Sequence, residues 1–423
     1  MLVPTITDYF CGLRIEACLA PAEKKRYLTL SLAVNLSVLI FFKSFNFFIA
    51  ELSQLLISFG FNAAMFNLSV ILPLGISFYT FKSLSYTIDI YRGQIKPVNN
   101  FLDYALFVSF FPSLLAGPIE RGSNFLPQIQ NKRQITWENI RLGAYLISWG
   151  AFKKVFIADN LALMAQDILL HPFVHSRSEL LVALYAAAFR LYCDISGYTD
   201  MARGLAKFMG FDLSINFRLP YFSRNISEYW RKWHMSMTYW FRDYVFFPVL
   251  ANTKGNAYLS SFITLLCISL WHSISWESVW RGVYYGLAVC IYQFYKKKLC
   301  VADPAKVGRF RSLVSAAVSR ITTFHVVCIG GLFYYNYSVE SVFELIVKII
   351  GGLNMHDFIA SFRNLSVYIW VLLVVEIMQA VRSDEFIVMK ANVVLKALFY
   401  WLIFWGVFGG AGGLGNPFIY FRF

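Results

Sequence analysis

Residues 257–295 read AYLSSFITLLCISLWHSISWESVWRGVYYGLAVCIYQFY, and this stretch decides the class of fold. It contains two apolar runs, 257–272 and 278–295, which are joined by a short connection. At a rise of about 1.5 Å per residue, the first run climbs about 24 Å through a hydrocarbon core about 30 Å thick. The stretch therefore predicts a helical hairpin within a membrane, with His272 deep in the protein at its tip.

Apolar runs of this kind recur along the whole chain. Hydrophobic residues make up 58% of the sequence and charged residues 15%, whereas a typical soluble domain has about 25% charged residues. Too few charges remain to cover a water-facing surface, so the composition excludes an ordinary soluble enzyme. The pattern predicts an all-α polytopic membrane protein with about ten to eleven transmembrane helices. The clearest spans are 26–43, 66–82, 101–117, 139–157, 179–195, 257–272, 278–295, 313–335, 365–381 and 395–409.

Three weaker stretches complete this prediction. Residues 45–60 and 338–351 are amphipathic and are expected to be further spans or surface helices. Residues 8–20 are too short and too charged for a full span. No repeat, low-complexity tract or long linker divides the sequence. Residues 1–423 are therefore expected to form a single membrane-embedded domain.

Basic residues predict the orientation of the hairpin. The net charge is +14. Accumulation of Lys and Arg in cytoplasmic loops explains this charge better than nucleic-acid binding, for which no recognition fold is visible. Two basic clusters flank the hairpin and are expected in the cytoplasm: Arg203, Lys207, Arg218, Arg224, Arg231, Lys232, Arg242 and Lys254, and then Lys296, Lys297, Lys298, Lys306, Arg309 and Arg311. The connection at His272 then lies toward the outer leaflet.

Residues 217–250 differ in kind from the spans. Asn225 and Glu228 have the spacing of a helix-capping pair, and aromatic residues follow at helical spacing with charged residues on the opposite face. This pattern predicts an amphipathic helix that lies along the membrane interface. His234 falls at the margin of its aromatic face.

Two histidines are candidates for chemistry. A histidine titrates near neutral pH and can take a proton from an attacking hydroxyl. His272 is placed in the membrane core, where ionisable residues are functional candidates by default; capping of a helix end is the alternative. For His234 a tolerated interfacial histidine is the simpler interpretation from the residues alone. The remaining histidines are expected in loops or at the interface: His171, His175, His325 and His356.

Other patterns are less informative. The sequence has no spacing of His, Cys and carboxylate residues typical of a metal site, so no metal is expected. Asp194 and Asp200 are carboxylates at the end of a span. They are expected to form ion pairs with Arg190 or Arg203, or else to shape a polar channel. The glycine-rich residues 409–415 are expected to form a loop rather than a phosphate site.

Several ordered motifs resemble one family, the membrane-bound O-acyltransferases (MBOAT), in the bacterial branch that includes the alginate O-acetylation membrane protein. The resemblance covers nearly the whole chain. The motifs are LPLGISFYTF at 72–81, SYTIDIYRG at 85–93, FFP at 110–112, AGPI at 116–119, DISGYTDMA at 194–202, WRKWH at 230–234, RDY at 242–244, LWH at 270–272 and FIYF at 418–421. The start differs, because relatives carry additional apolar helix upstream that is absent or shortened here.

The resemblance implies helices around a central tunnel, a cytoplasmic acyl donor and an outer hydroxyl acceptor. His272 matches the family's essential histidine, and His234 matches its second, supporting polar position. No bound cofactor is implied; the donor substrate is acetyl-CoA or another acyl thioester. The resemblance also implies a multi-pass protein of the bacterial cytoplasmic membrane, surrounded by lipid. The function is then O-acetylation of an exported polysaccharide such as alginate or peptidoglycan.

We expect His272 to act as general base, and His234 to assist at the donor side. The residues expected to bind the substrates are Trp230, Arg231, Lys232, Trp233, Arg242, Trp271 and Ser273. The outward connections are too short for a polymer-binding domain, so an exported serine-type acetyltransferase or a carrier is the expected partner. Two alternatives stay open: D-alanyl transfer to teichoic acid from a carrier protein, and transport of a lipid-linked sugar.

Overall fold

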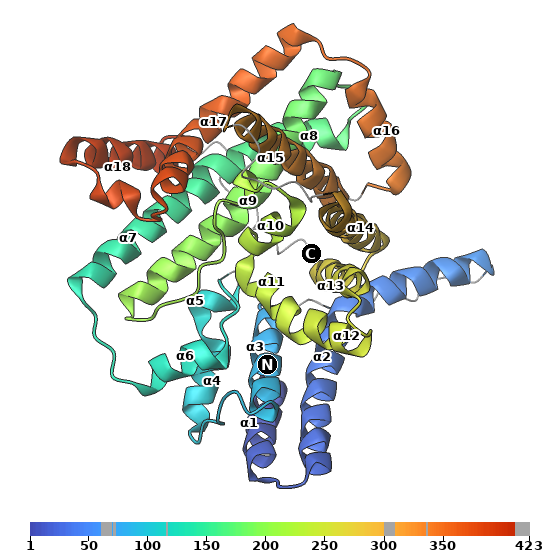
Figure 1. Cartoon of the computed structure of the whole chain (residues 1–423), viewed down its shortest axis with the longest axis vertical. Helices are drawn as coiled ribbons and strands as arrows, with labels where there is room; N and C mark the ends of the chain where they lie inside the picture. Colours follow the sequence, from blue (N-terminus) through green and yellow to red (C-terminus); the bar gives the residue numbers. More distant parts are fainter. Residues whose placement is uncertain (61–69, 71–72, 116, 300–308, 336, 411–423) are drawn as a thin grey trace.

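The computed structural model describes the whole chain except residues 61–69, 71–72, 116, 300–308, 336 and 411–423. Within the described residues the chain is helical and contains no strand, which confirms the all-α class (Figure 1). The longer helices are α1 (Leu2–Ala17), α2 (Pro21–Ser58), α3 (Ile76–Tyr91), α7 (Trp137–Ala151), α8 (Asp159–Leu170), α9 (Arg177–Phe208), α13 (Ala257–His272), α14 (Trp276–Leu299), α15 (Arg309–Gly331), α16 (Val339–Ile350), α17 (Met355–Arg382) and α18 (Val393–Phe408).

Shorter helices connect these. They are α4 (Phe101–Ser109), α5 (Phe111–Leu114), α6 (Gly122–Gln130), α10 (Ile226–Lys232), α11 (Met235–Phe241) and α12 (Phe247–Asn252), the 3₁₀ turns η3 (Pro220–Phe222), η6 (Leu332–Tyr335) and η7 (Ile387–Lys390), and the π-helical stretches η2 (Phe152–Ala158) and η4 (Arg242–Phe246). Four described segments are long and apolar enough to cross a membrane: 21–58, 177–208, 311–335 and 355–382. The α13 and α18 helices are shorter but equally apolar.

The α9 helix is the centre of the molecule (Figure 1). It packs along the continuous helix formed by α7, η2 and α8, and small residues allow the two backbones to approach closely. A Cβ atom added at Gly150 would lie 2.5 Å from the carbonyl oxygen of Gly197, and one at Gly204 would lie 2.6 Å from that of Gly143. The stretches predicted as spans at 139–157 and 179–195 therefore lie in the two helices that pack at the centre of the molecule.

The α13 and α14 helices form the hairpin predicted from residues 257–295. They pack along their length, and Ser269 Oγ donates to the carbonyl oxygen of Ser278 at 2.6 Å near the closed end. A Cβ at Gly282 would lie 2.9 Å from the Cα of Leu266. The apolar run at 257–272 coincides with α13, because Asn256 caps its first turn through Leu259 N and Ser273 leaves it in an extended conformation.

The N-terminal helices pack together beside this centre (Figure 1). The buried carboxylate of Asp8 on α1 accepts hydrogen bonds from Ser31 Oγ at 2.6 Å and from Asn35 Nδ2 at 2.8 Å, both on α2. Residues 26–43 and 45–60, predicted as separate stretches, lie largely in the single helix α2. The predicted weak stretch 338–351 is the separate helix α16.

Two predicted helices are interrupted. The span predicted at 101–117 ends at Ser109 and restarts as the one-turn helix α5. Pro112 explains this break, because proline lacks an N–H and its ring clashes with the carbonyl of the preceding turn. The motif residues Leu72 and Ala116, the Gly-rich residues 411–415, Cys300, Lys306, and the motif 418–421 lie outside the described residues, as does much of the predicted span 66–82.

The amphipathic helix predicted within 217–250 is also broken, at His234. His234 lies between α10 and α11 with φ 43° and ψ 55°, in the left-handed region. The extended segment before η3 supports this break: Met235 N donates to the carbonyl oxygen of Asn216 at 2.8 Å, and Ser236 Oγ donates to Asn216 Oδ1 at 2.9 Å. Helical spacing in the sequence could not reveal a break that depends on a distant asparagine.

Candidate active site

His272 is the last residue of α13 and is buried, with 7% of its surface exposed. It borders a cavity of about 590 Å³ between α2, α3 and the tip of the α13–α14 hairpin, which we call the hairpin cavity. Trp271 and Ser273 line the same cavity. Ser273 Oγ lies 2.5 Å from Ser278 Oγ, which ties the connection back to α14. Three residues predicted for the site therefore meet at one cavity.

The indole of Trp271 lies between the two candidate histidines. Its ring centroid is 4.6 Å from that of His272 and 6.3 Å from that of His234. Phe81 of α3 stacks on the same indole at 5.3 Å. Sequence positions 234 and 272 are thus brought to one aromatic centre by tertiary packing.

A second cavity, of about 570 Å³, is called here the polar cavity. Phe217 lines the polar cavity, and its ring is 5.9 Å from the His234 imidazole. Trp271 lines the hairpin cavity and contacts the same imidazole. His234 therefore lies between a residue of each cavity, and only 1% of its surface is exposed.

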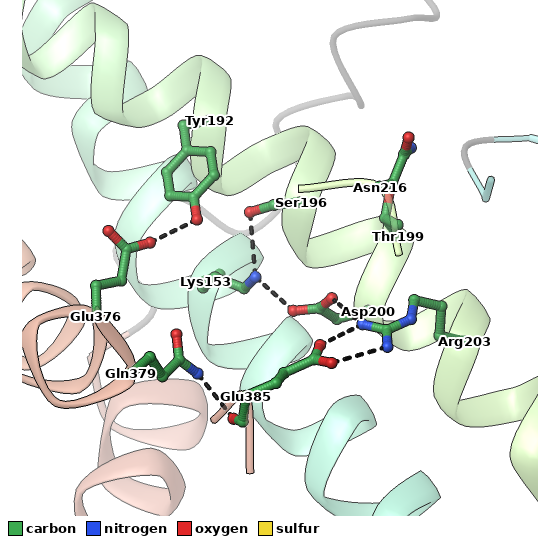
Figure 2. Close-up of polar contacts among 10 residues, drawn as sticks. All are labelled: Lys153, Tyr192, Ser196, Thr199, Asp200, Arg203, Asn216, Glu376, Gln379 and Glu385. Carbon is green, nitrogen blue, oxygen red and sulfur yellow. Dashed lines mark hydrogen bonds and ion pairs between the residues drawn. The ribbon is translucent and has the colours of Figure 1, made fainter. Parts of the chain in front are cut away.

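Figure 2 shows polar contacts at the floor of the polar cavity; of the residues drawn, Lys153, Tyr192, Asp200, Glu376, Gln379 and Glu385 line the cavity. Lys153 Nζ is 2.5 Å from Asp200 Oδ2 and 3.1 Å from Ser196 Oγ. Arg203 forms an ion pair with Glu385 and lies 3.5 Å from Asp200. Lys153 stands on the π-helical stretch η2, a local geometry that often occurs at functional sites.

A second contact closes this floor toward α17. Tyr192 OH donates to Glu376 Oε1 at 2.5 Å, so α9 and α17 are joined by a buried hydrogen bond (Figure 2). Charged groups removed from water are stable only with such partners. Lys153, Asp200, Arg203, Glu376 and Glu385 therefore each have a hydrogen-bond or ion-pair partner within this network.

Three arginine side chains line the polar cavity, and none of them was predicted to bind a substrate. Arg218, Arg224 and Arg320 line the cavity, and none forms an ion pair with a described carboxylate within 4.0 Å. The predicted Lys232 also lines it but pairs with Glu228 at 2.7 Å. The basic residues on both sides of Leu219 and Pro220 were the sequence feature that could have indicated a site for an anionic ligand.

The other predicted basic residues lie elsewhere. Arg231 is exposed, and Arg242 pairs with Asp243 at 2.7 Å; neither lines the two cavities. Burial alone would raise the pKa of the Asp243 carboxyl, but hydrogen bonds from Arg242 and Arg121 outweigh it and hold that pKa below its usual value. Arg242, Asp243 and Arg121 form an ionic contact that lines neither cavity.

Trp230 and Trp233 line a narrower aromatic cavity with Tyr285 and Tyr334. The Tyr334 ring lies 6.1 Å from the His272 ring, and Trp233 packs on Phe217 at 5.1 Å. The aromatic cavity therefore has ring contacts with Phe217, which lines the polar cavity, and with His272.

Asp200 has the predicted partner Arg203 and a closer one, whereas Asp194 pairs with a residue that was not predicted. Asp194 pairs with Lys154 at 2.8 Å, whereas Arg190 donates to Tyr335 OH at 3.3 Å. Asp200 pairs mainly with Lys153, with the predicted Arg203 as a more distant partner. The prediction missed both lysines because they come from η2, which packs on α9 only in the folded chain. Among the described residues no group of three or more His, Cys, Asp or Glu could hold a metal ion.

Three known proteins show what this chain is similar to in sequence. The sequence is 38% identical over 290 residues to the probable alginate O-acetylase of Pseudomonas putida, covering 68% of this chain and 59% of the relative. It is 30% identical over 380 residues to the peptidoglycan O-acetyltransferase of Helicobacter pylori, covering 83% of this chain and 70% of the relative. It is 28% identical over 273 residues to the teichoic acid D-alanyltransferase of Bacillus subtilis, covering 61% and 67%.

The chain thus spans less than two thirds of the length of the alginate relative from Pseudomonas putida. The matched family model, that of the membrane-bound O-acyltransferases, covers residues 85–334. This range includes both candidate histidines, the α13–α14 hairpin and most residues that line the polar cavity. With a multi-pass helical fold and these matches, the chain belongs to the membrane-bound O-acyltransferase family.

Proposed function

We propose that this protein transfers an acetyl group from a cytoplasmic thioester, acetyl-CoA, to a hydroxyl acceptor at the outer face of a bacterial cytoplasmic membrane. The observation that carries the proposal is the arrangement of two cavities around His234 and His272. A transfer between two substrates requires that both reach one centre from separate binding spaces. The acetylated product is an exported polysaccharide, as the names of the relatives suggest.

The polar cavity is the proposed donor side. Guanidinium groups bind phosphate oxygens with two parallel hydrogen bonds, and Arg218, Arg224 and Arg320 line this cavity. The phosphates of acetyl-CoA would bind there, while its thioester reaches toward His234 past Phe217 and Trp233. A cavity of this size accommodates part of a cofactor-sized ligand. The donor side is the cytoplasmic side because Arg218 and Arg224 belong to the basic cluster before the hairpin.

The hairpin cavity is the proposed acceptor side. His272 would take the proton of the acceptor hydroxyl as general base, which typically contributes about 10²–10⁴-fold to the rate. Trp271 and Ser273 would hold the acceptor beside it. A partner such as an exported serine-type acetyltransferase would receive the acetyl group and pass it to the polymer.

The proposal is tested by reconstitution. Proteoliposomes would receive acetyl-CoA labelled in its acetyl group, together with alginate or peptidoglycan fragments, with and without the candidate partner. We expect release of the free thiol, and label in the polymer only when the partner is present. Efficient labelling of polymer by the chain alone would contradict the role of the partner.

The second candidate function is D-alanyl transfer, which the similarity to the Bacillus subtilis enzyme favours. It differs in the donor, which would be a D-alanyl carrier protein. Purified chain that transfers labelled D-alanine from a carrier but no acetyl group from acetyl-CoA would favour this alternative. A transporter of a lipid-linked sugar would cleave neither acetyl-CoA nor a D-alanyl carrier thioester.

A further inference from the structure

The α2 helix brings a cation to the end of the helix that carries His272. Lys43 Nζ donates hydrogen bonds to the carbonyl oxygens of Trp271 and His272, the second at 3.1 Å. The same ammonium lies 5.4 Å from the centre of the Trp271 ring. The last carbonyls of a helix have no partner within it and form the negative end of the helix dipole. Lys43 therefore caps α13 from another helix, at the candidate general base.

Lys43 also lines the hairpin cavity beside His272. The described residues that line this cavity include no Asp or Glu, and Lys43 forms no ion pair with a described carboxylate. An ammonium group has three N–H donors, and the described contacts account for two of them. One N–H donor of Lys43 thus remains for a ligand in the cavity.

A second cation stands nearby without a described carboxylate. Arg281 of α14 has 2% of its surface exposed and donates to Ser269 Oγ at 2.9 Å and to Ser278 Oγ at 3.0 Å. Its guanidinium lies 4.0 Å from the centre of the Tyr334 ring, which in turn contacts His272. Arg281 is therefore held by the hairpin itself, and it adds positive potential to the surroundings of His272.

Cations that are withdrawn from water without an acidic partner are costly in free energy. That cost becomes useful where negative charge appears during a reaction, because preorganised positive groups then stabilise the transition state without reorganising. The acyl transfer proposed above has such a stage. The acceptor oxygen bonds to the carbonyl carbon as its proton moves to His272, and the carbonyl π electrons move onto oxygen. The carbon–sulfur bond then breaks, and the thiolate takes the proton from His272 to leave as a thiol.

We propose that Lys43 is a catalytic residue that stabilises this oxyanion with its remaining N–H and its charge. The inference rests on the proposed acyl transfer and adds to it the group that balances the negative charge. Lys43 lies before residues 85–334, the range that the family model matches. The role is therefore an assignment from the geometry of this chain.

The test compares three variants in membrane vesicles, by thiol release from acetyl-CoA in the presence of the candidate partner and alginate oligosaccharide. Lys43→Met keeps the aliphatic stem and removes the charge, so kcat should fall by about 10²–10³-fold while KM changes little. Lys43→Arg keeps a cation and should retain most of the wild-type kcat. Lys25→Met is the matched control, since Lys25 is an exposed residue of the same helix, and it should behave as wild type. Thermal unfolding in detergent reports the capping contribution separately.

Three results would overturn the proposal: a wild-type kcat in Lys43→Met, an equal loss of kcat in Lys43→Arg and Lys43→Met, or a loss that appears in KM rather than kcat. The last would show that Lys43 binds a substrate in its ground state. Failure of the proposed function is visible separately, because the wild-type protein would then release no thiol from acetyl-CoA.

Discussion

At the scale of single residues, His272 and His234 differ in how the backbone holds them, although both contact the indole of Trp271. His272 ends a regular helix, and two lysine hydrogen bonds hold the carbonyls around it. His234 is held in the left-handed region, which costs a non-glycine residue roughly 1–2 kcal/mol. A strained conformation of this kind persists only where many surrounding contacts hold the residue in place.

Substitution His272→Ala should abolish thiol release and polymer acetylation while leaving insertion and folding intact. Loss of a general base lowers the rate by about 10²–10⁴-fold. The remaining activity should therefore be at the background of a membrane assay. His356→Ala is the control, because the His356 side chain is 92% exposed at the start of α17. Near-normal turnover by a folded His272→Ala protein would exclude the base mechanism.

For His234 the informative substitution is His234→Asn. Asparagine tolerates the left-handed conformation, so the variant should fold with an unchanged melting temperature. Because the proposed role of His234 is positioning, we expect turnover to fall by about 10–10²-fold and residual activity to remain. If His234→Asn is as inactive as His272→Ala at saturating donor, the proposed division between the two histidines is wrong.

At the scale of elements, close packing of α13 on α14 sets the position of the hairpin tip. The contact passes through Gly282, where any side chain would meet the backbone of Leu266. The same region contains the hydrogen bonds from Arg281 to Ser269 and Ser278. Displacing the two helices would therefore move His272 relative to α2.

Substitution Gly282→Val should accordingly lower both stability and activity. Overpacking of a closed contact costs about 1–3 kcal/mol, which should appear as a lower melting temperature in detergent. Gly331→Val is the matched control, because a Cβ at Gly331 of α15 meets nothing within 4 Å. Equal melting temperatures for the two variants would show that α13 and α14 can move apart at Gly282 without loss of stability.

At the scale of the whole molecule, each of the two cavities is lined by a residue that contacts His234, and the proposed mechanism requires that the cavities open toward opposite sides of the membrane. Basic residues flank both ends of the hairpin, so its tip should be reached from outside. The polar cavity, whose wall includes Arg218 and Arg224, should be reached from the cytoplasm.

This topology is checked by cysteine labelling in a background without native cysteines. Cysteines at Lys254 and Lys297, both exposed, should react only with a reagent applied from the cytoplasm. A cysteine at Ser275, in the connection between α13 and α14, should react only from the outer side. Labelling of Ser275→Cys from the cytoplasm alone would reverse the proposed donor and acceptor sides.

Much of this protein was determined by local sequence. The apolar runs predicted the helices because burial of an apolar face in lipid depends on a residue and its near neighbours. The hairpin at 257–295 was predicted closely, since both of its helices and its short connection are adjacent in the chain. His272 and Trp271 were found for the same reason.

Only the tertiary structure decided which distant groups share a site. Asn216 accepts a hydrogen bond from Ser236 beside the helix break at His234. Lys153 and Lys154 form ion pairs with Asp200 and Asp194 of α9. Lys43 donates a hydrogen bond to the last carbonyl of α13. In each case the partners are far apart in sequence or on different helices. Their pairing depends on how the helices are rotated and packed against one another. An apolar sequence pattern indicates which face of a helix is buried, but not which other helix packs against that face.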